Sequence, residues 1–251
     1  MYIEQGGEGP DLLVMLHGLG ATAAAWSPMG EQASERWRGR WLAMDMPGNG
    51  ESAPQDSCGI GQYAASVARS MLSHVDPTGR LVVLGHSLGG VIALALATGW
   101  FGVAPHRVFG VGIKVAWSDD ELQRMEKMAA QPARYFATQA EALDRYLKVS
   151  GLAGIAGAES PVAMRGLAQD AQGWRLAMDP RAFGVGKPPV AELMTLARCS
   201  VRLGRAGADA LVTREQLRAV DPRADDLGPH GHNVMVEAPT QVWDWMDADS
   251  K

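Results

Sequence analysis

Apolar residues occur in short unbroken runs along this chain, a pattern that predicts strands buried on both faces. The run at 81–84 is purely aliphatic, and the residues at 60–71 and 91–97 have the apolar spacing of helices. We therefore expect an α/β fold built around one sheet. Further strands are predicted at 11–16, 41–45, 107–113 and 199–204, with a short last strand at 225–228.

The run at 81–84 leads into a turn with a serine at its centre. Gly85 and Gly89 flank Ser87 in the pattern G-x-S-x-G, between the predicted strand and the predicted helix at 91–97. This pattern is the nucleophile elbow, a strained turn whose neighbours must be small. The alternative is an ordinary glycine-rich connection in which the serine only caps the helix. The strand–turn–helix context favours a nucleophilic Ser87.

A second glycine-rich turn, at 17–20, follows the predicted strand at 11–16. Its position ahead of the elbow favours half of an oxyanion hole, with the backbone N–H of Leu19 as one donor and that of Leu88 as the other. His17 is interpreted as a structural residue that supports this loop. Asp45 is interpreted in the same way, because it is followed by a turn-rich loop whose N–H groups it can accept.

Composition and charge narrow the classes of function. The chain has 251 residues, of which 47% are hydrophobic, so it can bury a substantial core. A formal charge of −5, with no dense basic run, argues against nucleic acid or a membrane surface as a partner. Cys58 and Cys199 are too few for a disulfide framework and lack metal-site spacing. The first residues lack a signal-peptide pattern, so we expect a cytoplasmic protein. The sequence patterns imply neither a metal nor a cofactor.

Four segments together resemble the α/β-hydrolase family, and their order and spacing match along nearly the whole chain apart from a middle segment. The resemblance implies a mostly parallel sheet with helices on both faces and a site at the carboxyl ends of the strands. The segments are 17–20 (HGLG), 45–52 (D-x-P-G-x-G-x-S), 85–90 (GHSLGG) and 231–239 (G-H-x-V-x-x-E-x-P).

Strand patterns stop in the middle segment, at 116–198. Capping boxes begin at Ser118 and Thr138, each with a glutamate three residues later, and predict two helices. Further helical pieces are expected at 161–170 and 189–198. A helical insertion at this place looks like the cap that roofs the active site in this family.

We therefore expect a hydrolase core at 1–115 and 199–251, interrupted by a helical cap at 116–198. Most methionine and aromatic residues of the cap are expected to pack within it, while a minority line an apolar substrate pocket. The candidates for the pocket are Trp117, Tyr146 and Trp174.

A serine nucleophile needs a base and an acid, which follow it along the chain in the order Asp or Glu, then His, in this family. Ser87, Asp209 and His232 have this order, and the last two lie on loops after predicted strands. His232 is preferred to His230 because the Gly-His pair and the following Glu-x-Pro match the family. Asp209 is preferred to four other candidates for the acid. These are Asp119, Asp120, Asp225 and Asp226.

The triad and the resemblance imply a serine hydrolase that cleaves a small or medium carboxylic ester, lactone or amide through an acyl-enzyme. A carbon–carbon bond hydrolase or a cofactor-free lyase on the same triad is an alternative. A non-catalytic binding protein is another, because the fold alone does not prove chemistry. The expected partner is a small-molecule substrate with an apolar portion, and no pattern indicates an oligomeric state.

Overall fold

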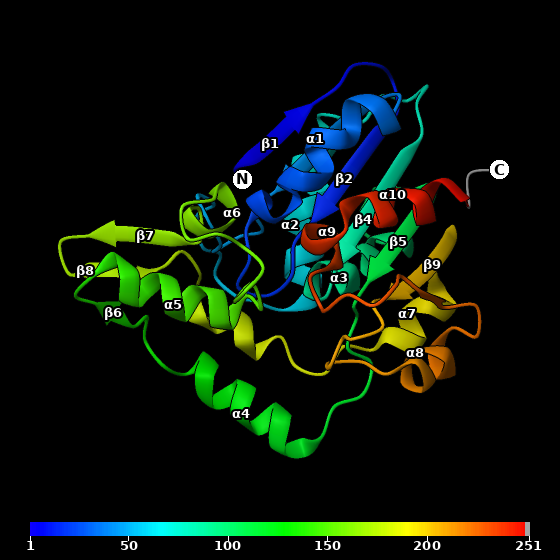
Figure 1. Ribbon diagram of the computed structural model, residues 1–251. Coiled ribbons are helices and arrows are strands. Elements are labelled where there is room, and N and C mark those ends of the chain that lie inside the picture. Colours follow the sequence, from blue (N-terminus) through cyan, green and yellow to red (C-terminus); the bar gives the residue numbers. More distant parts are fainter. Residues whose placement is uncertain (249–251) are drawn as a thin grey trace.

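The computed structural model describes residues 1–248 and contains a seven-stranded sheet with helices on both faces (Figure 1). The strand order is β1-β3-β2-β4-β5-β9-β10, in which β1 runs antiparallel to β3 and the other neighbours are parallel. The strands are β1 (Ile3–Gly6), β2 (Leu12–Leu16), β3 (Arg40–Met44), β4 (Leu81–His86), β5 (Arg107–Val111), β9 (Ser200–Arg205) and β10 (Asp225–Asp226).

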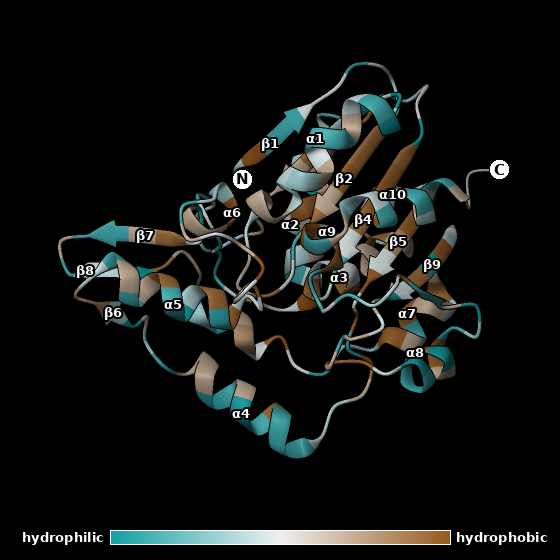
Figure 2. Ribbon diagram, in the orientation of Figure 1, coloured by the Kyte–Doolittle hydropathy of each residue, from teal (hydrophilic) through white to brown (hydrophobic). Residues whose placement is uncertain are grey.

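The central strands β2 and β4 are buried along their whole length, which explains their unbroken apolar sequences. Figure 2 shows them as continuous hydrophobic bands through the middle of the molecule. Their register pairs Leu16 with Gly85, and that of the next pair places His86 opposite Val111. The turns that follow β2, β4 and β5 therefore meet at one edge of the sheet.

Side chains alternate between two apolar clusters, one on each face of the sheet. The helix α3 buries all of its residues, so the Ala/Leu-rich sequence after the elbow forms a central part of one cluster. That face carries α2 (Ile60–Leu72), α3 (Leu88–Ala97), α7 (Val190–Leu196) and α8 (Arg214–Val220); the other carries α1 (Ser27–Arg36), α9 (Val234–Glu237) and α10 (Pro239–Ala248).

The six strands expected from apolar runs are all present, with ends within two residues of the predicted ones. The edge strand β1 was not predicted. Its four residues lack a continuous apolar run, because an edge strand is only partly covered and none of its residues is fully buried.

The segment between β5 and α7 forms a layer beside the sheet, seen at the lower left of Figure 1. It holds two longer helices and a small antiparallel sheet of order β6-β8-β7. Its elements are α4 (Asp119–Ala129), β6 (Tyr135–Phe136), α5 (Gln139–Val149), α6 (Pro161–Met164), β7 (Leu167–Asp170), β8 (Gly173–Leu176) and a 3-10 turn, η2 (Pro180–Gly184).

The capping boxes predicted at Ser118 and Thr138 are confirmed, and each begins a helix at the next residue. The expectation of an entirely helical segment is wrong, because α6 covers only 161–164 of the helix expected at 161–170 and the chain then forms a hairpin of β7 and β8. In its turn Asp170 accepts the N–H of Gln172 at 2.8 Å, and Gly173 has a φ of 124°. Both features favour a tight turn over a continuing helix.

The end of the 116–198 segment packs differently from the rest. The helix α7 lies against α3, and its Val190 and Leu193 belong to the apolar cluster of the core. In residues 1–248, no helix combines the length and apolar character needed to cross a bilayer.

Candidate active site

Ser87 occupies a strained turn between β4 and α3. Its φ of 50° and ψ of −116° make it the only non-glycine residue with positive φ in residues 1–248. Its N–H donates to the carbonyl of Val111 at 2.8 Å, which fixes the turn against β5. A Cβ on Gly85 would collide with the carbonyl of Gly89, and one on Gly89 with that of Leu16. The glycines therefore allow strand and helix to approach closely enough to present the serine.

The glycine turn after β2 passes directly beside the serine. A Cβ on Gly18 would lie 3.2 Å from Cβ of Ser87, and Gly18 and Leu19 line the same cavity as Ser87. Leu88 is the first residue of α3, where a backbone N–H has no acceptor in a preceding turn. The two N–H groups expected to bind an oxyanion thus belong to turns on either side of Ser87.

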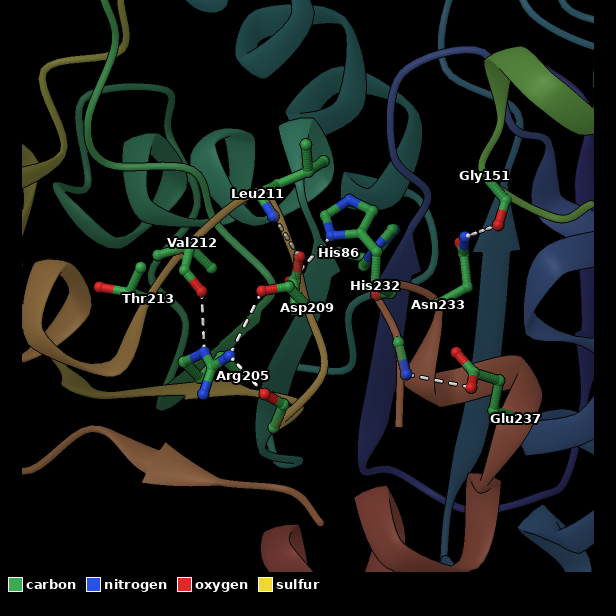
Figure 3. A network of polar contacts seen from close by, with 12 residues as sticks. His86, Gly151, Arg205, Asp209, Leu211, Val212, Thr213, His232, Asn233 and Glu237 are labelled. Atoms are coloured by element: carbon green, nitrogen blue, oxygen red, sulfur yellow. Dashed lines mark hydrogen bonds and ion pairs between the residues drawn. The ribbon is translucent and has the colours of Figure 1, made fainter. Parts of the chain in front are cut away.

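His232 and Asp209 lie together on the loops that follow β10 and β9. Nδ1 of His232 is 2.9 Å from Oδ2 of Asp209, whose side chain is completely buried (Figure 3). The other oxygen, Oδ1, accepts the N–H of Leu211 at 2.9 Å. A carboxylate held in this way keeps the proton of the neutral imidazole on Nδ1, which leaves Nε2 available as a base.

One cavity contains the serine and the histidine. It has a volume of about 630 Å³ and is lined by Ser87, His232 and Leu19 from the core, and by Trp117 and Met125 from the other layer. Within residues 1–248 the Ser87 hydroxyl makes no hydrogen bond to His232, although both face this space. Catalytic hydrogen bonds often shorten only when substrate binds.

Comparison with known proteins agrees with this geometry. The model of the "Alpha/beta hydrolase family" matches residues 13–245. The chain belongs to the alpha/beta hydrolase family. Its relatives include proteins named as esterases.

Two curated relatives illustrate the similarity of this hydrolase to known sequences. It is 36% identical over 108 residues to a pimeloyl-[acyl-carrier protein] methyl ester esterase from Nitrosomonas europaea, covering 43% of this chain and 38% of that protein. It is 35% identical over 115 residues to the dihydrolipoyllysine-residue acetyltransferase component of an acetoin cleaving system from Pseudomonas putida, covering 45% and 28%. The matches thus span less than two fifths of these relatives' own length.

Two solved structures share the fold over nearly the whole hydrolase chain. E-2-(acetamidomethylene)succinate hydrolase superposes with a TM-score of 0.79 at 18% identity, covering 98% of this chain and 93% of that one. The thioesterase domain from the curacin biosynthetic pathway gives a TM-score of 0.77 at 17% identity, covering 97% and 93%.

The loop that carries Asp209 in this hydrolase is held by a buried arginine that sequence analysis missed. Arg205, the last residue of β9, is 7% exposed. Its guanidinium donates to the carbonyls of Val212 at 2.8 Å, Gly207 at 2.9 Å and Asp209 at 3.3 Å (Figure 3). It also pairs with Asp226 at 3.1 Å. An arginine directly after the predicted strand at 199–204 was the available signal, because a buried cation needs partners.

His86, next to Ser87, holds the main chain of His232, the candidate base. Its Nε2 donates to the carbonyl of His232 at 2.9 Å, and the two rings lie 4.5 Å apart. Burial, and then the nearby His232, lower the pKa of His86 well below its ordinary value. His86 therefore stays neutral and acts as a hydrogen-bond donor beside the base.

Three further contacts fix this corner of the hydrolase. The amide of Asn233 donates to the carbonyls of Ser150 at 3.1 Å and Gly151 at 2.9 Å, which joins the base loop to the end of α5. Glu237 accepts the N–H of Gly231 at 3.0 Å. Gly112 has a φ of 64°, and a Cβ there would lie 3.2 Å from the His232 ring. The position of the His232 ring thus requires a glycine after β5.

The two residues interpreted as structural make the contacts expected of them. His17 is completely buried; its Nδ1 donates to the carbonyl of Gly18 at 2.8 Å and its Nε2 accepts the N–H of Met46 at 2.9 Å. Burial lowers its pKa. Asp45 accepts the N–H groups of Ala23 at 2.6 Å and Glu51 at 2.9 Å.

The other candidates for the acid and the base contact residues outside the group formed by Ser87, Asp209 and His232. His230 contacts Gln241 at 3.1 Å, and Asp226 pairs with Arg205 and Arg214. Asp225 pairs with Arg202 and accepts the indole N–H of Trp245. The remaining two acids lie in the exposed first turn of α4. These are Asp119 and Asp120.

Of the three pocket candidates, the structure brings only Trp117 to the catalytic cavity. Tyr146 is 1% exposed and packs inside the outer layer, where its hydroxyl donates to the carbonyl of Val162 at 3.1 Å. Trp174 lies in β8, opposite Phe136. Helical spacing predicts that a residue is buried, but it does not distinguish a residue packed inside a layer from one that lines a cavity. Nowhere in residues 1–248 do three metal-ligating side chains converge.

Proposed function

We propose that this protein is a serine hydrolase of carboxylic esters that works through an acyl-enzyme, with Ser87 as nucleophile, His232 as base and Asp209 as acid. The observation that carries the proposal is the 2.9 Å contact between Nδ1 of His232 and the buried Asp209, beside a cavity shared with Ser87. Relatives named as methyl ester esterases support an ester over a lactone or an amide.

The reaction follows from these positions. Ser87 Oγ attacks the ester carbonyl while Nε2 of His232 takes its proton, and the buried carboxylate of Asp209 stabilises the resulting imidazolium. The N–H groups of Leu19 and Leu88 bind the oxyanion. His232 then gives the proton to the leaving alcohol, and water activated by His232 releases the acid and frees Ser87.

The cavity favours a substrate with an apolar portion. Its walls include Leu19, Trp117, Met125 and Phe183 close to the serine. Apolar walls with few polar groups are typical of small-molecule sites. Trp117 is the proposed aromatic contact, at the point where the chain leaves β5 for α4.

The test is intact-mass measurement after exposure to a fluorophosphonate, followed by turnover of a panel of p-nitrophenyl esters. We expect one adduct on the wild type, none on Ser87→Ala, and a loss of turnover of about 10⁶-fold in that variant. Ser73→Ala, a serine exposed at the end of α2, is the matched control and should behave as wild type. An adduct without ester turnover would contradict the ester assignment and favour the carbon–carbon hydrolase or lyase alternative.

A further inference from the structure

The walls of the catalytic cavity and of its neighbour are basic, although the whole chain has a formal charge of −5. A second cavity, of about 460 Å³, shares Met128, Val149 and Phe183 with the first, so the two are neighbours with a common wall. Five basic residues line the pair of cavities, against one acid, Glu121. The basic residues are Lys114, Arg124 and Lys148 in the first cavity, and Arg134 and Arg145 in the second.

Two of these cations already have partners. Lys114 pairs with Glu121, and Lys148 pairs with Asp144 at 2.7 Å. Arg134 and Arg145 form no ion pair within residues 1–248, and both are exposed at the second cavity. The guanidinium of Arg134 lies 4.9 Å from the centre of the Phe136 ring. Stacking on a ring leaves the edge of a guanidinium, which carries its N–H donors, available to an anion.

The carboxylates nearest to these arginines along α5 are already engaged. Glu141 accepts the N–H of Thr138 at 3.1 Å as part of the capping box, and Asp144 holds Lys148. None of the residues that line the second cavity is acidic. The wall of the second cavity therefore carries two guanidinium groups and no carboxylate, while Glu141 and Asp144 border a neighbouring hollow that the same arginines line.

The wall between the serine and the arginines is apolar. Besides the three shared residues, Leu176 and Met178 line the second cavity. A substrate that reaches from Ser87 into this space meets a reactive centre first, then an apolar wall, then two guanidinium groups. That order of chemistry matches a molecule whose reacting ester and anionic group are separated by an apolar segment.

We propose that Arg134 and Arg145 are specificity residues that select acyl substrates with an anionic group at the far end of an apolar segment. The inference rests on the proposed ester hydrolysis and names its substrate class. The anion can be the terminal carboxylate of a dicarboxylic half-ester, on the acyl side, or the phosphate of a phosphopantetheine thioester, on the leaving-group side. Both present the oxygen geometry that a guanidinium binds with paired hydrogen bonds.

The test compares matched substrates that differ only in the anion. One arm uses methyl half-esters of straight-chain dicarboxylic acids against methyl esters of neutral acids of equal length. The other uses S-acyl phosphopantetheine against S-acyl pantetheine, and the arm with the larger preference identifies the source of the anion. We expect kcat/KM to favour the anionic member by about tenfold, through KM, equivalent to a single good ion pair.

The double variant Arg134→Gln/Arg145→Gln should lose this preference and leave turnover of the neutral esters within twofold of wild type. Arg175→Gln is the matched control, because Arg175 lies opposite Tyr135, the neighbour of Arg134, pairs with Asp170 and lines neither cavity. Calorimetry of half-ester binding to Ser87→Ala, with and without the two arginine changes, gives a readout that needs no turnover.

The two proposals fail in different ways. Equal kcat/KM for anionic and neutral substrates, together with equal binding by both forms of Ser87→Ala, would overturn the role of the arginines and leave ester hydrolysis by Ser87 standing. A wild type that forms no fluorophosphonate adduct and hydrolyses no ester would overturn the proposed function. Half-ester binding that depends on the arginines would then still support the anion site.

Discussion

The core and the cap, here the layer from α4 to η2, are stabilised in different ways. In the core, β2, β4 and α3 are buried along their whole length, and the proposed triad lies on turns and loops at the ends of β4 and of neighbouring strands. In the cap, α4 has no fully buried side chain and contacts mainly η2. Rigid elements thus hold the reacting groups, while a weakly packed layer shapes the space above them.

A few contacts couple the two regions. The amide of Asn233 joins the loop of His232 to the carbonyls of Ser150 and Gly151. On the other side, the N–H of Gly50 donates to the carbonyl of Ala177 at 2.7 Å. The difference between the regions implies that changes in the core alter turnover of every substrate or global stability, whereas changes in the cap alter selection or local order.

Asp209→Asn should produce the largest change. Asparagine keeps an acceptor for the N–H of Leu211 but no longer fixes the tautomer of His232 or stabilises its charge. We expect kcat to fall by about 10⁴-fold for all esters, with the fold retained by circular dichroism. Asp119→Asn, in the cap, is the control and should leave kcat unchanged. Near-normal turnover by Asp209→Asn would move the acid elsewhere.

Arg205→Met should lower the free energy of unfolding by about 3 kcal/mol, because three buried carbonyls lose their donor. Asp226 keeps Arg214, which limits the loss. Urea unfolding measures the change, and Arg205→Lys should restore part of it. Arg175→Met removes a half-exposed ion pair in the cap and should cost at most about 1 kcal/mol. Equal costs for the two methionine variants would contradict the distinction between core and cap.

Much of the core was predictable from sequence for a physical reason. A strand buried on both faces consists mainly of apolar residues, so 12–16 and 81–84 are recognisable as apolar runs, and the elbow follows from two glycines around Ser87. Capping boxes were equally readable, because Ser118 and Thr138 pair with glutamates only three residues away.

What could not be predicted depends on how individual loops fold and on which residues they bring together. The role of Arg205 depends on a loop that folds back over it, and the requirement for glycine at 112 depends on where His232 lies. Tyr146 has the same helical spacing whether it faces a pocket or a packed interior. The hairpin of β7 and β8 consists of short half-buried strands with no apolar run to mark them.

The free energy of unfolding should fall at acid pH because histidines of the core become protonated on unfolding. The cap segment at 116–198 contains no histidine. The pKa of buried His86 is lowered, so below its ordinary value near 6.5 the unfolded chain binds a proton that the folded one does not. Its contribution is complete above that pH and is lost progressively as pH falls below it.

His86→Gln keeps an N–H donor for the carbonyl of His232 and removes the titration. Urea unfolding at pH 5, 6 and 7 should therefore show a shallower pH dependence in this variant than in wild type. His17, whose pKa is also lowered, supplies a remaining slope of the same sign. An unchanged slope in His86→Gln would show that His86 takes up a proton in the folded state.

The smallest expected effect is the loss of a helix N-cap, which should lower local stability in the cap but global stability in the core. Ser118→Ala removes the cap of α4 and should cost about 1 kcal/mol, but only locally, because α4 buries no side chain fully. Amide exchange in α4 should quicken about fivefold while the global unfolding free energy stays constant. Thr213→Ala removes the same kind of capping box from α8, whose Leu217 is buried in the core. In Thr213→Ala the free energy of global unfolding should fall by about 1 kcal/mol. If Ser118→Ala also lowered the free energy of global unfolding, the cap would unfold together with the core.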